Sequence, residues 1–167
     1  MEKKTWKVAV IGCGSFAQLQ YLPNISKEAN AETVAVVDVN PEFTHSIAEK
    51  YGIPNWYTTV EELIEKCDFD IAIDAASIQQ HHAINMAVLG AGKHLISQKP
   101  AAETVEEISE QIELAKKNHV KFVCAPVHPL RYDLNMALQM IRDGVIGNAY
   151  YAKCNMSHGG PEYFQYR

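Results

Sequence analysis

Two glycines, at residues 12 and 14, directly follow a short apolar run in the stretch VAVIGCGSFA, which begins at residue 8. Their spacing matches the GxGxxG/A pattern of a dinucleotide-binding loop, with Ala17 as the small third residue. The first glycine permits a tight turn, the second lets the backbone approach a pyrophosphate, and the third lets helix and strand pack closely. A tight turn without a ligand is the alternative, because the pattern alone is weakly specific. We expect Gly12, Gly14, Ser15 and Phe16 to contact a nucleotide cofactor.

An acidic residue ends the second apolar run, ETVAVVD, at Asp38. At this place in a nucleotide-binding sheet, a carboxylate accepts hydrogen bonds from the adenosine ribose and repels the 2′-phosphate of NADP. The interval from Gly12 exceeds the usual figure of about 20 residues, which a longer helix containing Pro23 would explain. Capping of the next helix is the alternative role, although Asn40 is better placed for it. The sequence therefore favours NAD over NADP.

The alternation of apolar and amphipathic stretches predicts the scaffold that positions these residues. Five short stretches rich in Val, Ile and Ala are typical of strands buried on both faces, namely WKVAVIG, ETVAVVD, FDIAIDA, KHLIS and VKFVCA. Helix boundaries are marked by Asn40 with Pro41, by Gly52, and by two pairs with capping-box spacing, Thr59 with Glu62 and Thr104 with Glu107. Strands that alternate with helices imply an α/β fold with a doubly wound parallel sheet, the Rossmann arrangement, over residues 1–125.

The pattern changes after the stretch VCAPVHP. Residues 130–143 are typical of a helix, and residues 148–156 alternate as a strand does. One helix and one strand cannot close a domain, because both edges of an isolated strand stay unpaired. We therefore expect residues 126–167 to begin a second, C-terminal unit that is truncated in this chain; the family resemblance given below implies that this unit is an α+β domain for substrate binding and oligomerisation. The strand over 148–156 is expected to be disordered or paired with a copy of itself.

Composition narrows the class of partner. The 167 residues are 47% hydrophobic and 21% charged, as in an ordinary globular domain, and the formal net charge of -5 argues against nucleic acid. The four cysteines form no CxxC pair, which suits a reducing compartment and indicates neither a zinc nor a disulfide framework. No apolar run approaches the ~20 residues of a membrane helix. We expect a cytoplasmic protein that binds small molecules and does not associate with a membrane.

Two adjacent histidines, His81 and His82, raise the question of a metal site. Neighbouring residues on a helix point about 100° apart, so they do not chelate one ion as an i, i+4 pair does. We expect no metal, and we expect His82 to be exposed or packed.

The ordered series of motifs resembles the Gfo/Idh/MocA oxidoreductases, the family of glucose-fructose oxidoreductase and inositol dehydrogenase. The glycine loop and Asp38 come first, followed by SIQQH at 77–81, where the family often has Pro-x-x-x-His. AGKHLISQKP at 91–100 is similar to the family's aGKHVxxEKP. RYDLNMALQMIRDGVIGNAY at 131–150 resembles the family's Arg-containing helix and its entry to a second domain. The series spans nearly the whole chain, and its order is more specific than any single piece.

The resemblance implies an NAD(P)-dependent dehydrogenase that transfers a hydride between nicotinamide and a sugar or polyol carbon. Lys99 occupies the position of the EKP lysine, which assists proton transfer or positioning near the nicotinamide and the substrate. The resemblance further implies cofactor contacts from Ala76, Ser77, His81, Gln98 and Lys99. His128, Arg131 and Tyr132 lie at the junction of the two units, where Arg131 is expected to bind substrate or to form a structural ion pair.

The sequence departs from the family pattern in three places. Gln98 replaces the glutamate of EKP, which removes a carboxylate beside Lys99. Ala76 and Ser77 replace the common Thr-Pro. Family members are roughly twice this length, as two domains require, and their second catalytic group, usually a histidine, has no counterpart here. The 167-residue chain alone is therefore expected to be catalytically incomplete, and a dinucleotide-binding module or NAD sensor without turnover is the alternative function.

Overall fold

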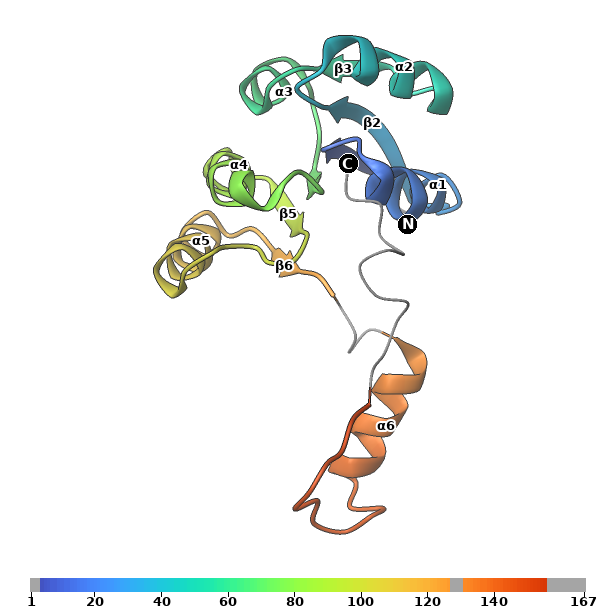
Figure 1. Ribbon diagram of the computed structural model, residues 1–167, viewed down its shortest axis with the longest axis vertical. Helices are drawn as coiled ribbons and strands as arrows, with labels where there is room; N and C mark the ends of the chain where they lie inside the picture. Colours follow the sequence, from blue (N-terminus) through green and yellow to red (C-terminus); the bar gives the residue numbers. More distant parts are fainter. Residues whose placement is uncertain (1–3, 127–130, 156–167) are drawn as a thin grey trace. The chain divides into compact units, whose positions relative to one another are not determined.

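A computed structural model describes residues 4–126 and 131–155 of the chain. The chain divides into two compact units, residues 1–127 and residues 128–167. Figure 1 labels the helices and strands of both units.

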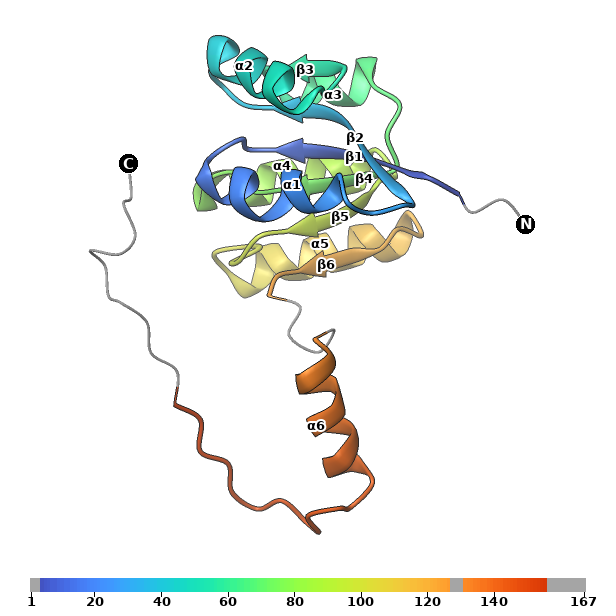
Figure 2. The same ribbon diagram turned by 90° about the vertical axis from the view of Figure 1, so that its right-hand side faces the viewer.

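Six parallel strands form the sheet of the first unit, in the order β3-β2-β1-β4-β5-β6 (Figure 2). The strands are β1 (Trp6–Ile11), β2 (Ala31–Val37), β3 (Asn55–Tyr57), β4 (Ile71–Asp74), β5 (His94–Ser97) and β6 (Phe122–Cys124). The chain winds outward from β1 to β3, returns to the other side of β1 with β4, and winds outward again. The doubly wound parallel sheet predicted from the sequence is thus confirmed, and β1 and β4 flank its topological switch point.

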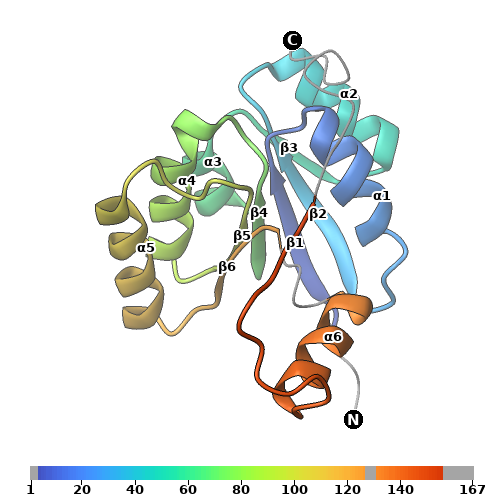
Figure 3. The ribbon, with the colours of Figure 1, turned by 60° about the horizontal axis from the view of Figure 1, so that its bottom comes forward.

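Helices cover both faces of this sheet, with α3, α4 and α5 on one face and α1 and α2 on the other (Figure 3). Their bounds are η1, a π-helical segment (Ala17–Tyr21), α1 (Leu22–Ile25), α2 (Pro41–Tyr51), α3 (Val60–Lys66), α4 (Ile78–Gly90) and α5 (Val105–Lys117). Alternate residues of β1 enter two separate cores. Ala9 and Ile11 pack with Leu63 and Val88, whereas Val8 and Val10 pack with Leu22. Burial on both faces explains why the strands are continuously apolar.

The N-caps follow the sequence with one difference. Thr104 and Glu107 form a complete capping box at the start of α5, as predicted. At the start of α3, the Thr59 hydroxyl accepts a hydrogen bond from the Glu62 backbone N–H, but the Glu62 carboxylate bonds to the backbone N–H and hydroxyl of Thr58 instead of the Thr59 N–H. The second predicted box is therefore only half formed, because the hydroxyl of Thr58 offers the carboxylate a second donor.

The second unit contains α6 (Tyr132–Arg142), in the region predicted to be helical, and α6 has no buried residue. The predicted strand over 148–156 is not formed in its described part, residues 148–155. The physical reason is the lack of a second strand among the described residues of this unit, because a strand needs a partner for its backbone donors and acceptors. Residue 156 lies outside the described residues.

Among the described residues, no helix has both the length and the apolar character required to cross a membrane.

The complete capping box at α5 generates a stability prediction. Replacing Thr104 by Ala leaves the Glu107 backbone N–H without its side-chain acceptor, and we expect the free energy of unfolding to fall by about 1 kcal/mol. Urea unfolding followed by circular dichroism measures this. Ser109→Ala is the matched control, because the Ser109 hydroxyl is exposed and bonds only within the helix; its effect should stay within about 0.5 kcal/mol. Equal losses in the two variants would contradict the assigned role of the box.

Candidate nucleotide-binding site

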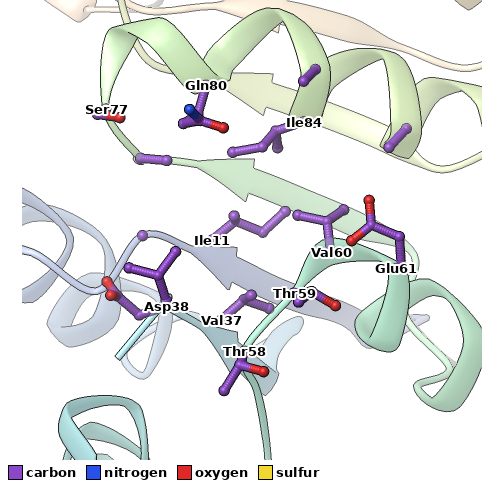
Figure 4. A pocket seen from close by; sticks show the side chains of 15 residues that line it. Ile11, Val37, Asp38, Thr58, Thr59, Val60, Glu61, Ser77, Gln80 and Ile84 are labelled. Atoms are coloured by element: carbon purple, nitrogen blue, oxygen red, sulfur yellow. The ribbon is translucent and has the colours of Figure 1, made fainter. Parts of the chain in front are cut away.

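The carboxyl ends of parallel strands meet at one edge of the sheet, and a cavity of about 440 Å³ lies at this edge. The ends of β1 and β2, the segment that leads into α3, and the N-terminal half of α4 form its walls (Figure 4). Of the residues expected at the site, Gly12, Asp38, Ala76 and Ser77 line the cavity. Most of the remaining wall is apolar, with Ile11, Val37 and Ile84 among its side chains. Such a hollow, largely apolar with a few polar groups, is typical of a small-molecule site.

Gly12 makes the closest backbone contact at the switch point. Its φ of 84° lies in the left-handed region, and a Cβ atom at this position would lie 2.5 Å from the Ala76 nitrogen and 2.6 Å from the Ala75 carbonyl carbon. The Gly12 N–H donates to the Val37 carbonyl at 2.8 Å. Only glycine fits a turn that passes this close to the β4–α4 loop. A Cβ at Gly14 would by contrast meet nothing within 4 Å.

Asp38 holds the glycine loop from the end of β2. Its Oδ2 accepts a hydrogen bond of 2.9 Å from the Cys13 backbone N–H. Asn40, and not Asp38, caps α2, since the Asn40 Oδ1 accepts from the Phe43 N–H. The Asp38 carboxylate is half-buried and lines the cavity, so it faces both the loop and the space beside it.

The Cys13 thiol is buried beneath this loop and donates to the Val37 carbonyl. Burial, together with the nearby Asp38 carboxylate, raises the pKa of the Cys13 thiol to about 12. The thiol is therefore protonated at neutral pH and does not act as a nucleophile.

The remaining residues expected in the loop lie on helical backbone that runs from residue 15 to residue 25. Ser15 and Phe16 are exposed, and neither they nor Gly14 line the cavity. Phe16 packs edge to face with Tyr21, with 5.7 Å between the ring centroids. Ala17 is buried in the core between helix and sheet, which is the packing role expected of a small third residue.

His81 lies beneath the site and not on the cavity wall. Its side chain is 1% exposed, and its two ring nitrogens lie 2.6 Å from the Pro100 carbonyl oxygen and 3.1 Å from the Ala76 carbonyl oxygen. The cofactor contact that the family resemblance implies for His81 stays a prediction. The next residue, His82, is partly exposed, and its Nε2 lies 3.6 Å from a Glu110 carboxylate oxygen.

Asp74, at the end of β4, is a residue that the sequence analysis missed. It is fully buried, its Oδ1 accepts from the Ala76 N–H at 3.0 Å, and the same oxygen lies 4.0 Å from the His81 Nε2. Burial raises the pKa of the Asp74 carboxyl to about 6. A carboxylate that ends a strand and is followed by small residues in DAAS is the signal that could have identified it.

Gln98 and Lys99 follow β5. The Gln98 side-chain amide donates to the Tyr21 hydroxyl and so joins the β5–α5 loop to the helix after the glycine loop. Burial raises the pKa of Tyr21. Lys99 is exposed, and no hydrogen bond or ion pair of its ammonium is present among the described residues.

Arg131, which the sequence predicts at the junction of the two units, lies in the second unit. Arg131 forms a two-point ion pair with Asp133, with N···O distances of 3.1 and 2.7 Å. His128 lies outside the described residues. Within 4–126 and 131–155, no three His, Cys, Asp or Glu side chains gather as a metal site would require.

The fold and the site together define a class. A doubly wound parallel sheet, a glycine turn after β1, a carboxylate at the end of β2 and a cavity at the switch point characterise a dinucleotide-binding Rossmann domain.

Sequence comparison identifies the family. The chain belongs to the Gfo/Idh/MocA oxidoreductase family with an NAD-binding Rossmann fold, whose sequence model matches residues 6–125. The resemblance drawn from the motifs is thereby confirmed, as is an NAD(P)-binding Rossmann fold.

Individual relatives are distant and longer than this chain. Oxidoreductase P35 of Formosa agariphila is 28% identical over 142 residues, which are 83% of this chain and 43% of the relative. D-glucoside 3-dehydrogenase of Escherichia coli is 25% identical over 150 residues, or 90% of this chain and 43% of the relative. The chain thus spans less than half the length of these curated relatives.

A solved structure shows the same fold. The scyllo-inositol dehydrogenase of Lactobacillus casei, with bound NAD(H) and scyllo-inositol, superposes with a TM-score of 0.79 at 23% identity. The match covers 86% of this chain and 43% of that one.

Gly12→Ala should destabilise the protein strongly, because the added methyl group collides with backbone and not with a movable side chain. We expect a loss of about 2–5 kcal/mol in the free energy of unfolding, measured by urea unfolding. Gly14→Ala is the matched control: its methyl group enters open space, and the loss should be within about 1 kcal/mol. A Gly12 variant as stable as the Gly14 variant would contradict the close approach.

Proposed function

We propose that this chain carries the cofactor-binding part of an NAD-dependent oxidoreductase that moves a hydride between nicotinamide and a sugar or polyol carbon. The observation that carries the proposal is the cavity at the switch point, with Gly12 and Asp38 in its wall. Family membership supports the reaction class. The names of relatives, a D-glucoside 3-dehydrogenase and a scyllo-inositol dehydrogenase, support the substrate class.

The residues at the cavity fit a dinucleotide. The open space beside Gly14 and the exposed backbone that follows leave room for a pyrophosphate, which helix-starting N–H groups bind well. Asp38 offers a carboxylate to the ribose hydroxyls, and the apolar wall suits an adenine ring. The same carboxylate repels a 2′-phosphate, so we propose NAD in preference to NADP.

The proposed chemistry divides between cofactor and protein. Bound nicotinamide supplies the acceptor or donor of the hydride. Lys99, exposed at the end of β5, is proposed to take or return the proton of the substrate hydroxyl or to hold that oxygen in place. Gln98, fixed by Tyr21, orients the backbone from which Lys99 projects.

The second unit is proposed to begin a substrate domain, as the sequence suggested. Two observations support this: the family model ends at residue 125, close to the boundary between the two units, and α6 leaves its apolar residues exposed. We also propose that Arg131 contacts substrate in exchange for its bond to Asp133, and that the assembled protein is a homo-oligomer.

Gly14→Ala tests the proposed phosphate contact. Its methyl group would stand where the backbone must approach a pyrophosphate, so we expect the Kd for NAD to rise about tenfold or more, with the fold retained. Isothermal titration calorimetry on the wild-type and variant chains measures this. If the wild-type chain binds neither NAD nor NADP, the proposed function fails.

Asp38→Asn tests the choice of cofactor. The amide oxygen can still accept from the Cys13 N–H, while the charge that repels a 2′-phosphate is removed. We expect the wild-type chain to bind NAD at least about tenfold more tightly than NADP, and the variant to lose most of that ratio. Competitive titration of the two cofactors decides it, and an unchanged ratio would show that Asp38 does not set the preference.

Lys99→Met tests the proposed proton handling. Loss of a general acid–base group lowers the rate of hydride transfer by about 10²-fold or more, while NAD binding at the adenosine end should persist. Turnover is measured by NADH fluorescence with a panel of inositols, glucosides and polyols in the assembled enzyme, in which the cofactor-binding part carried by this chain is joined to its substrate domain. Lys99→Arg, which keeps the charge, serves as the comparison. Full turnover in the Met variant of that enzyme would remove Lys99 from the mechanism, and NAD binding without turnover by the wild-type assembled enzyme would favour the sensor function.

A further inference from the structure

We infer that His81 is a positioning residue, which joins the β4–α4 loop to the β5–α5 loop by donating two hydrogen bonds as a buried imidazolium balanced by Asp74. The link between the loops is a property of the chain itself. Only its consequence for Lys99 rests on the proposed function.

The two contacts of the ring connect segments far apart in the sequence. One ring nitrogen lies 3.1 Å from the Ala76 carbonyl oxygen, in the loop that follows β4. The other lies 2.6 Å from the Pro100 carbonyl oxygen, in the loop that follows β5. The side chain is 1% exposed, so water does not compete for these bonds. His81 therefore spans the two loops from beneath, starting from the first turn of α4.

The chemistry of the partners fixes the protonation state. A carbonyl oxygen only accepts hydrogen bonds, and neutral imidazole has one N–H. With one nitrogen unprotonated, a lone pair would face a carbonyl oxygen, and a buried acceptor would lose its donor at a cost. Both contacts are satisfied only when both ring nitrogens carry hydrogen, which makes the ring a cation.

Asp74 supplies the opposite charge. Its Oδ1 lies 4.0 Å from the His81 Nε2, and its Oδ2 has no hydrogen-bond partner among the described residues. A fully buried carboxylate with an unpartnered oxygen needs a nearby positive charge. If the proton moved from the ring to Asp74, both groups would be uncharged, but one of the two hydrogen bonds from the ring to a carbonyl oxygen would be lost. The ion pair therefore satisfies more of the groups present than its neutral form does.

Further buried side chains hold the β5–α5 loop from the same side. The Ala101 carbonyl accepts from the side-chain amides of Asn85 and Gln111, at 3.1 and 3.0 Å. The Ser97 hydroxyl donates to the Gln98 carbonyl at 3.1 Å. With the bond from His81 to Pro100, the carbonyls on both sides of Lys99 are fixed, while the Lys99 side chain stays exposed. His81 differs from the other anchors because it alone also bonds the β4–α4 loop.

NMR of the imidazole nitrogens tests the charge directly in the full wild-type chain without cofactor. We expect both ring nitrogens of His81 to be protonated at neutral pH, with the signals assigned by their loss in His81→Phe. Asp74→Asn removes the balancing charge, and one ring nitrogen should then become unprotonated. A neutral ring in the wild-type chain, or a ring that Asp74→Asn leaves doubly protonated, would overturn the inference.

Amide hydrogen exchange tests the positioning role. His81→Phe fills the same space without a donor, and exchange in residues 75–77 and 98–104 should accelerate about tenfold or more, with the strands unaffected. Gln79→Phe is the matched control on the same helix, because the Gln79 side chain is exposed, and it should leave both loops unchanged. Unaltered exchange in the His81 variant would overturn the positioning role. If that variant does not fold, His81→Gln supplies the assignment of the His81 signals, and the wild-type and Asp74→Asn spectra still decide the charge.

The two proposals fail separately. If the wild-type chain does not bind NAD, the proposed function is wrong, but the NMR and hydrogen-exchange tests of His81 remain valid because they are made without cofactor. If His81→Phe accelerates loop exchange and also lowers turnover by the assembled enzyme while the Kd for NAD stays constant, His81 positions Lys99. Turnover unchanged despite mobile loops would show that Lys99 does not depend on His81.

Discussion

The close approach of Gly12 to the backbone of Ala75 and Ala76 is the contact on which the rest of the site depends. It brings the loops that follow β1 and β4 within van der Waals distance of each other at the switch point of the sheet. Asp38 then fixes the same loop from the side of β2 through the Cys13 N–H. The ends of three strands are thereby connected, two of them by close backbone contact and the third through the Asp38 side chain, and the cavity lies beside them.

The other half of the site is built differently. Between β5 and α5, backbone carbonyls are held by buried polar side chains, among them His81, Asn85 and Gln111. Buried polar groups are stabilising only when nearly all are satisfied, and together they specify one arrangement. The glycine turn is fixed by the absence of a side chain, whereas this loop is fixed by several side chains acting together. Both arrangements leave the cavity at the carboxyl ends of the strands free for a ligand.

The sequence predicted the elements that depend on local patterns, and it missed those that depend on tertiary contacts. Continuous apolar runs identified five strands because burial on both faces demands them, and the capping pair at Thr104 requires only neighbouring residues. β3 was missed because it has three residues and pairs only with β2 at the edge of the sheet. The position of Asp38 after a buried strand indicated its place correctly. The direction of the His81 ring and the contacts of the Asp74 carboxylate depend on loops distant in sequence. The local pattern DAAS places Asp74 at the end of a strand but does not show what its carboxylate contacts.

The neighbours of Gln98 explain why an amide suits the position where the family has the glutamate of EKP. A carboxylate here would lie beside Tyr21, whose hydroxyl already sits in a partly buried environment that disfavours its ionised form. A neutral amide instead donates to that hydroxyl without adding a negative charge near buried Asp74. Among the residues that the structure describes, Asp74 is then the buried carboxylate beneath the β4 and β5 loops, and the His81 Nε2 lies 4.0 Å from its Oδ1. Gln98 and His81 therefore act together. Gln98 connects the loop that carries Lys99 to η1 without adding a negative charge, and His81 connects the same loop to α4 and balances the charge of Asp74.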